Sequence, residues 1–167
     1  TMGNQSVFLP FNSNPARESG QLESFTDRYG TTASVDRNSE GRVSKMTRTA
    51  LGSSETFEYS YYSSGDRNQL LQTVVWKQGS TTVRSVEYDY HTGATARGAA
   101  GTLRTVQVKD AGGTEIETTY YRWYKAGDSN GFANALKYVV RQSSYDRMMT
   151  GVAPSGSNPD NASDSQI

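Results

Sequence analysis

LRTVQVKDAGGTEIETTYYRWY (residues 103–124) is the stretch that decides the fold of this chain. Its returning arm, 115–124, carries Tyr121 and Trp123 at alternate positions with Arg122 between them, which is typical of a strand with one buried and one wet face. In the first arm, 103–109, the step from Leu103 to Val106 breaks strict alternation, and a bulge soon after the leucine would reconcile it. Between them lies Ala111-Gly-Gly-Thr114, where glycine supplies the positive φ that a short turn needs. The sequence therefore predicts an antiparallel β-hairpin with its turn at Ala111–Thr114, within two residues.

The same unit recurs along the chain. An apolar residue opens each unit, and these openers are Val43, Leu70, Leu103 and Leu136. The last three lie 33 residues apart, and an aromatic residue follows 18 positions after each of the first three, as Tyr61, Tyr88 and Tyr121. A fixed period of this size indicates a repeat architecture, in which one unit cannot bury its apolar face alone.

The repeat predicts two further hairpins. One pairs Val43–Arg48 with Thr56–Tyr62, and the other pairs Leu70–Lys77 with Thr82–Tyr90 across a turn at Gln78–Thr81. The links between hairpins vary in length while the hairpins do not, so we expect register to be set inside each unit by cross-strand packing.

The returning strands carry aromatic residues at alternate positions: Tyr59, Tyr61, Tyr88, Tyr90, Tyr121 and Trp123. Polar residues such as Glu58, Asp89 and Arg122 stand between them. We therefore expect one aromatic face, which packs between successive hairpins, and one wet face. The alternative is that the aromatic face is a stacking platform for carbohydrate.

Composition indicates half-exposed sheet rather than a thick core. Of the 167 residues, 34% are hydrophobic, and eleven are tyrosines, which keep one polar end. Lys+Arg and Asp+Glu balance at 17 each, so no global field steers the chain onto nucleic acid. No apolar run approaches the ~20 residues of a membrane helix. We expect neither nucleic-acid binding nor membrane insertion.

Three parts follow from the pattern: a connector over 1–21, hairpin repeats over 22–142, and a polar tail over 143–167 that we expect to be disordered. The chain begins mid-pattern, and we expect it to be a piece of a longer polypeptide. The predicted fold is all-β, with antiparallel β-hairpin repeats forming a curved, largely single-layer sheet.

Residues that could carry chemistry are few. His91 is the single histidine, and we interpret it as a surface or turn residue because no serine or cysteine pairs with it in a hydrolase motif. Several aspartates fall at expected turns, where Asx-type hydrogen bonding is the interpretation and calcium the weaker alternative. They are Asp27, Asp36, Asp66, Asp110 and Asp128. The sequence predicts no enzymatic activity, no cofactor and no metal site.

Three short stretches carry a family resemblance. Gly41-Arg-Val-Ser-Lys-Met-Thr47, Tyr88-Asp-Tyr90 and the Gly-x-Leu-x-x-Val of Gly101–Val106 resemble the tyrosine-aspartate (YD) repeats of Rhs-type proteins. The family unit reads roughly Gly-Arg-Leu-x-x-Val, a Gly turn and a Tyr-x-Tyr-Asp strand. The resemblance covers about residues 22–142. Tyr61-Tyr62 and Tyr121-Arg122 depart from the Tyr-Asp dipeptide.

The resemblance implies a β-sheet strip that spirals into a hollow shell. In bacterial members, which include polymorphic toxins, the shell encloses a C-terminal toxin or adhesion domain, and the proteins are secreted or lie on the cell surface. The expected function is thus a structural segment of such a shell or scaffold. The expected partners are flanking repeats of the same polypeptide and the enclosed C-terminal domain. A carbohydrate-binding or adhesive module is the alternative. Members that release their cargo use an aspartate-rich cleavage segment, and since no Asp-Pro-x-Gly occurs here, no catalytic residue is carried over.

Overall fold

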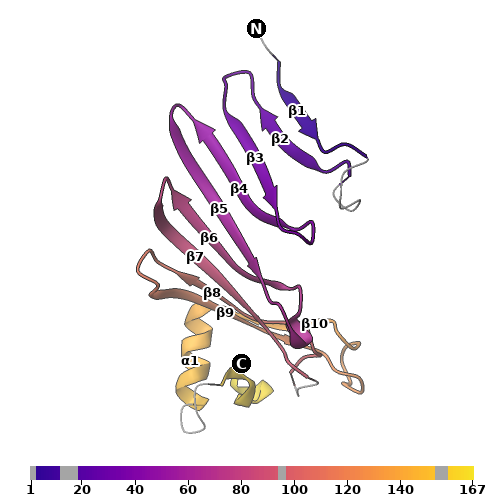
Figure 1. Ribbon diagram of the computed structural model, residues 1–167. Helices are drawn as coiled ribbons and strands as arrows, with labels where there is room; N and C mark the ends of the chain where they lie inside the picture. Colours follow the sequence, from indigo (N-terminus) through magenta and orange to yellow (C-terminus); the bar gives the residue numbers. More distant parts are fainter. Residues whose placement is uncertain (1–2, 12–18, 94–96, 153–157) are drawn as a thin grey trace. The chain divides into compact units, whose positions relative to one another are not determined.

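The structure is a computed structural model that describes residues 3–11, 19–93, 97–152 and 158–167. Ten strands form one antiparallel sheet in which each strand pairs with the next one along the chain (Figure 1). The strands are β1 (Gln5–Phe8), β2 (Leu22–Thr26), β3 (Thr32–Arg37), β4 (Val43–Ala50), β5 (Ser53–Tyr61), β6 (Leu71–Gln78), β7 (Thr81–Tyr90), β8 (Leu103–Lys109), β9 (Glu115–Trp123) and β10 (Leu136–Val140). The prediction of an all-β sheet built from antiparallel hairpins is confirmed.

Helical structure is confined to short pieces. The α-helix α1 spans Gln142–Val152, and single 3₁₀ turns span Gly65–Arg67 (η2), Pro159–Asn161 (η4) and Asp164–Gln166 (η5). Among the described residues, no helix is long and apolar enough to cross a membrane. Residues 143–167, predicted as a disordered tail, therefore contain a helix and two ordered turns where the structure describes them, and that prediction is wrong there.

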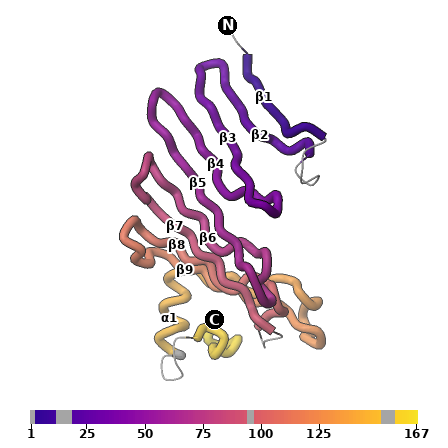
Figure 2. Tube along the Cα trace, in the orientation of Figure 1, coloured from indigo at the N-terminus to yellow at the C-terminus, as the bar shows by residue number. Residues whose placement is uncertain are grey.

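Contacts divide the chain into two compact units. Unit 1 comprises Thr1–Ser60 with Thr73–Ser85, and unit 2 comprises Tyr61–Gln72 with Val86–Ile167. The long strands β5, β6 and β7 contribute residues to both units, and Figure 2 follows the chain through them.

Unit 1 contains the first of the predicted hairpins. Strands β4 and β5 pair from Lys45↔Glu58 to Ala50↔Ser53. The two turn residues, Leu51 and Gly52, have φ of 49° and 79°, as a tight hairpin turn of this kind requires. The second hairpin, β6 with β7, turns between Gln78 and Thr81 as predicted.

Packing in unit 1 is thin. The rings of Phe57 and Trp76 stack with centroids 6.4 Å apart, and the Tyr59 hydroxyl donates to Met46 Sδ over 3.4 Å. Phe57 and Met46 nevertheless remain 37% and 38% exposed. All of the described residues that are fully buried belong to unit 2.

Unit 2 contains the third hairpin and the apolar core. Strands β8 and β9 pair from Thr105↔Tyr120 to Lys109↔Glu115, so the predicted turn at Ala111–Thr114 is confirmed. Leu103 and Tyr121 lie on these two adjacent strands. The core consists of four buried residues from β9, β10, α1 and the C-terminal end of the chain: Tyr120, Val140, Met148 and Ala162.

One face of β9 differs from its prediction. Thr118, Tyr120 and Arg122 are at most 1% exposed, because α1 and the C-terminal residues pack on this face. Arg122 was expected on a wet face, and that expectation is wrong. In unit 2 the sheet carries a second layer, whereas no helix of eight or more residues is described in unit 1.

Seven of the nine strand connections close in the same way. In each of them, the N–H of the first loop residue donates to the carbonyl of the last loop residue. The N–H of the next-to-last loop residue donates to the carbonyl of the first loop residue. The closing pairs are Leu9/Gln21, Asp27/Thr31, Asn38/Arg42, Tyr62/Leu70, His91/Thr102, Asp110/Thr114 and Tyr124/Ala135. The residue before the last always has φ between 67° and 84°, namely Gly20, Gly30, Gly41, Gln69, Gly101, Gly113 and Asn134.

This shared closure explains how links of different length leave the hairpins unchanged. Asp110/Thr114 encloses three residues and Tyr124/Ala135 encloses ten, yet the same two backbone bonds end both loops. A left-handed residue next to a strand produces a bulge that restores pairing in a fixed register. The register is thus restarted at every loop of this kind, whatever the loop contains.

Side chains reinforce the three short loops. Asp27, Asn38 and Asp110 each accept from the backbone N–H groups two and four residues ahead, over 2.8–3.0 Å. The bond from the Thr31 N–H is the main reason that the pKa of Asp27 is lowered. The Asx interpretation is confirmed for Asp27 and Asp110, whereas Asp36 lies within β3 and pairs with Lys45 at 2.9 Å.

Two neighbouring glycines of one loop test this closure. Gly113 has φ of 84° with open space where the methyl group of an alanine would stand, whereas Gly112 is not among the residues with positive φ. We expect Gly113→Ala to lower the free energy of unfolding by about 1 kcal/mol. Gly112→Ala, the matched control, should change it by less than about 0.5 kcal/mol. Equal effects in urea titrations would contradict the assignment.

Candidate functional site

The densest group of charged side chains lies in unit 2, where the sheet holds the C-terminal end of the chain. We call Arg97, Arg104 and Arg122 the arginine cluster, and residues 158–167 the C-terminal segment. Arg122 projects from β9 and Arg104 from β8, while Arg97 lies in the link between β7 and β8. The Arg97 carbonyl accepts from the Trp123 N–H at 2.9 Å, which fixes the link beside the end of β9.

Arg122 is the centre of the cluster and is only 1% exposed. Its Nη1 lies 2.7 Å from Asp164 Oδ1, and its Nη2 donates to the carbonyls of Pro159 and Ala162. Its Nε donates to the Tyr120 hydroxyl over 3.0 Å. A guanidinium is suited to this position because its fixed fork of donors satisfies several acceptors at once.

Asp160 is the second anchor of the C-terminal segment. Its two carboxylate oxygens accept from the Tyr120 hydroxyl at 2.8 Å and from Arg104 Nε at 2.9 Å. Its carbonyl accepts from Arg97 Nε at 3.1 Å. Arg104 also donates to Asn158 Oδ1 at 2.6 Å, so one guanidinium holds two residues of the segment.

Asp164 is the third anchor and is shared between strands. Besides Arg122, it pairs with Lys137 of β10 at 2.9 Å and with Arg97 at 3.5 Å. The hydrogen bond from Lys137 is the main reason that the pKa of Asp164 is lowered. The carboxylate therefore stays charged down to acidic pH and keeps its cationic partners.

The network extends into the sheet through Asp89. Its carboxylate pairs with Arg104 at 3.0 Å and with Arg67 at 2.7 Å. The Arg67 guanidinium carbon in turn lies 4.4 Å from the ring centre of Tyr62. Asp89 is the aspartate of the single Tyr-Asp dipeptide in the repeat strands, and here its role is to orient two arginines.

His91 lies beneath this network rather than at the surface. It is 1% exposed, and its Nδ1 is 4.0 Å from Asp160 Oδ2. Burial lowers the pKa of His91, so the ring is neutral at pH 7. A methyl group at Gly98 would overlap the imidazole ring, which explains glycine at that position. His91 is the first residue of the loop that follows β7, as a turn residue would be, but it is not a surface residue.

The site consists of ion pairs and hydrogen bonds between the arginine cluster and the C-terminal segment. Burial raises the pKa of Tyr120, so its hydroxyl remains a hydrogen-bond donor. The carboxylates of Asp160 and Asp164 are engaged by cations. Among the described residues there is no group of three or more His, Cys, Asp or Glu side chains that could hold a metal ion.

The predicted aromatic residues occupy the strands expected of them. Tyr59 and Tyr61 lie on β5, Tyr88 and Tyr90 on β7, and Tyr121 and Trp123 on β9, all half-buried. Tyr62, which the sequence analysis did not single out, packs edge-on against Tyr90 at 6.1 Å and donates to the Tyr88 carbonyl.

On β9 the aromatic residues lie opposite the buried face. Tyr121 pairs with Val139, Trp123 pairs with Leu136, and the indole N–H of Trp123 donates to the Leu103 carbonyl at 2.7 Å. Three of the predicted openers, Val43, Leu103 and Leu136, begin strands, and Leu70 immediately precedes β6.

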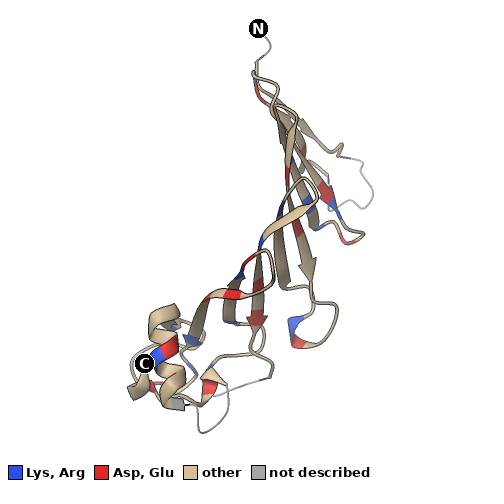
Figure 3. Cartoon of the chain, turned by 90° about the vertical axis from the view of Figure 1, so that its left-hand side faces the viewer, with Lys and Arg blue, Asp and Glu red and all other residues tan. Residues whose placement is uncertain are grey.

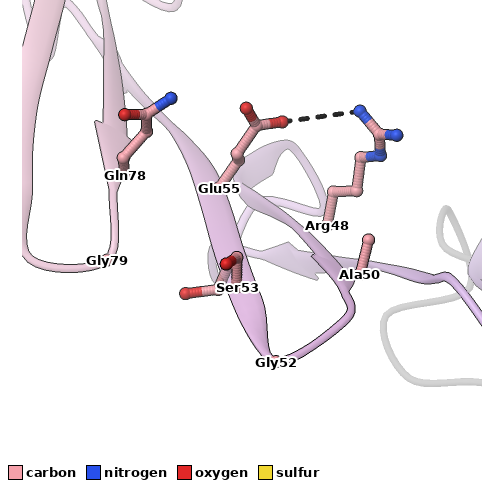
Figure 4. Close-up of a pocket in the computed structure, with 8 residues that line it drawn as sticks. Arg48, Ala50, Gly52, Ser53, Glu55, Gln78 and Gly79 are labelled. Carbon is pink, nitrogen blue, oxygen red and sulfur yellow. Dashed lines mark ion pairs between the residues drawn. The ribbon is translucent and has the colours of Figure 1, made fainter.

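A hollow of about 600 Å³ in unit 1 is a second candidate site. It lies between the β4–β5 and β6–β7 turns, where Arg48 and Glu55 form an ion pair at 3.5 Å (Figure 4). Its lining contains no aromatic side chain, so it offers no stacking surface for a sugar. Along the strands, basic and acidic residues are interspersed (Figure 3).

Comparisons with models of known protein families and with curated proteins gave no match.

The sequence contained weak signals for this site. Asn158-Pro-Asp160 is a turn-initiating pattern, and Ser163 with Gln166 forms a capping box at η5. Nothing in the spacing of Arg97, Arg104 and Arg122 indicates that they meet. Arg97 joins the other two because its carbonyl is bonded to the Trp123 N–H at the end of β9.

The contribution of Arg122 to stability can be compared with that of an exposed arginine, Arg147, in the same unit. Arg122→Gln removes a buried charge from four acceptors, and we expect a loss of about 3 kcal/mol in the free energy of unfolding. This is the low end for breaking a buried pair, because Asp164 can move into water. Arg147→Gln, on the exposed side of α1, should change stability by less than about 0.5 kcal/mol. Similar losses for both variants, measured by chemical denaturation, would contradict the central role of Arg122.

Proposed function

We propose that this chain is a structural segment of an Rhs/YD-type protein, in which tandem β-hairpins build part of a shell or scaffold. That shell encloses or presents a C-terminal toxin or adhesion domain, and the whole protein is secreted or displayed on the cell surface. The chain itself carries no catalysis, and its partners are neighbouring repeats of the same polypeptide.

The observation that supports this proposal most is the strand order. Ten strands pair strictly in sequence order without a crossover. Successive hairpins also end in the same loop closure. An array of this kind can be lengthened by adding hairpins, because each unit contacts mainly its neighbours. A shell built from one continuous sheet requires a sheet that can be lengthened in this way.

The composition of the two faces gives further support. In unit 2 one face is covered by α1 and the C-terminal segment, and the other carries half-exposed Tyr121, Trp123 and Val139. The edge strands of the described sheet, β1 and β10, offer backbone groups to further strands. Such a sheet is suited to continuation at both edges.

A longer chain tests the proposal. Two natural repeats added at each end should pair with β1 and β10, raise the melting temperature and reduce self-association, since open edges promote association. Calorimetry and sedimentation velocity would measure both effects. If the 167-residue chain is instead a monomer that melts above ~65 °C, the upper range for mesophile domains, the shell proposal is wrong.

Trp123 separates the structural role from carbohydrate binding. If the indole packs between hairpins, Trp123→Ala should lower the free energy of unfolding by roughly 2–3 kcal/mol, toward the low end for a core aromatic because one-sided sheets bury less. A carbohydrate platform predicts an almost unchanged melting temperature and loss of binding on a glycan array. Measuring both in one preparation distinguishes the two functions.

A further inference from the structure

The C-terminal segment is held as a bound peptide is held. Six of its polar groups are engaged from the sheet: the side chains of Asn158, Asp160 and Asp164, and the carbonyls of Pro159, Asp160 and Ala162. The donors are the arginine cluster, Lys137 and the Tyr120 hydroxyl. Contacts of this density to both backbone and side chains recognise a sequence as well as a shape.

Side-chain size is also recognised. Ala162 is 0% exposed, in contact with the core residues Tyr120, Val140 and Met148. Its carbonyl is capped by both Arg97 and Arg122. A larger side chain has no room at this position, so the site requires a small residue between its two aspartates.

The segment carries hydrogen bonds within itself that form its own turns. Asn158 Oδ1 accepts from the Asp160 N–H at 3.0 Å, and the Asn158 carbonyl accepts from the Asn161 N–H at 3.1 Å. Ser163 and Gln166 exchange the bonds of a capping box. A ligand that carries its own turns loses less conformational entropy on binding.

The attachment is electrostatic more than apolar. Only Pro159 and Ala162 of the segment are buried. Four cations face four carboxylates in this region. The cations are Arg97, Arg104, Arg122 and Lys137. Two of the carboxylates belong to the segment, and the other two, Asp89 and Asp128, belong to the sheet and its loops. Arg67 also pairs with Asp89, so without the segment five cations would face two carboxylates, which leaves three positive charges for an acidic ligand.

We propose that the arginine cluster, with Tyr120 and Lys137, is a peptide-recognition groove. Its ligand is the turn-forming sequence Asn-Pro-Asp-x-Ala-x-Asp of residues 158–164, supplied by a second copy of the chain in exchange for its own segment. Exchange of this segment joins two copies of the chain through a salt-sensitive contact. The proposal stands independently of the shell function.

Two complementary full-length variants test the exchange. Arg122→Gln spoils the groove and leaves the segment intact, whereas Asp160→Asn with Asp164→Asn spoils the segment and leaves the groove intact. Mixed together, they should form a 1:1 complex in sedimentation velocity that neither forms alone, and the complex should weaken as salt screens the contact. A mixture that sediments as the sum of its components overturns the proposal.

A labelled peptide of residues 158–167 gives a direct measurement of binding. Fluorescence anisotropy should show saturable binding to the Asp160→Asn/Asp164→Asn chain, and more than about tenfold weaker binding of a peptide with the same two substitutions. A peptide with Ala162→Arg should not bind. Equal binding of all three peptides overturns the proposed recognition.

Hydrogen exchange of the unaltered chain covers the case in which the variants fail to fold. If the segment detaches, its amides should exchange faster than those of β9, and excess unlabelled peptide should accelerate them further. Amides of the segment that exchange only together with β9 overturn the proposal, because the segment would then leave only on global unfolding.

Discussion

The pair of backbone bonds that closes seven of the nine strand connections is the constraint on which the sheet depends. Each closure needs one residue in the left-handed region, and glycine supplies it in five cases because it has no Cβ to clash. Gln69 and Asn134 adopt the same conformation at an energetic cost. With the ends of these loops fixed, each following strand starts in register with its neighbour. The hairpins therefore repeat although the links that join them do not.

A chain with few apolar residues must hold its second layer by other means. In unit 2 the contact between the sheet and the C-terminal segment contains a buried guanidinium, Arg122, and two aspartates, Asp160 and Asp164. Burying charge carries a desolvation cost that ion pairing offsets only when the geometry is good. Here each nitrogen of the central guanidinium finds an acceptor, and the resulting arrangement is specific to one sequence of the segment.

The hairpins were predictable because the information for them is local. The alternation of aromatic and polar residues along β9 and the glycine in the turn before it predict that Leu103 and Tyr121 lie on adjacent strands. This prediction needs no information from the rest of the chain. The second layer was not predictable, since Arg122 is buried by residues about 40 positions away. A polar sequence such as Asn158–Asp164 is indistinguishable from disorder until its ion-pair partners are known. His91 was misplaced for the same reason, because the residues that cover it lie beyond its own hairpin.

Strict sequence order among the strands has a consequence for how the chain reaches its structure. Each strand needs only the strand before it, so the sheet can grow from one end while the remainder of the polypeptide is still being synthesised. Short-range pairing of this kind shortens the chain closures that must precede each contact and favours rapid folding. The C-terminal segment is the exception, since its partners precede it by up to 67 residues. Its docking marks the moment at which the last hairpins have been completed.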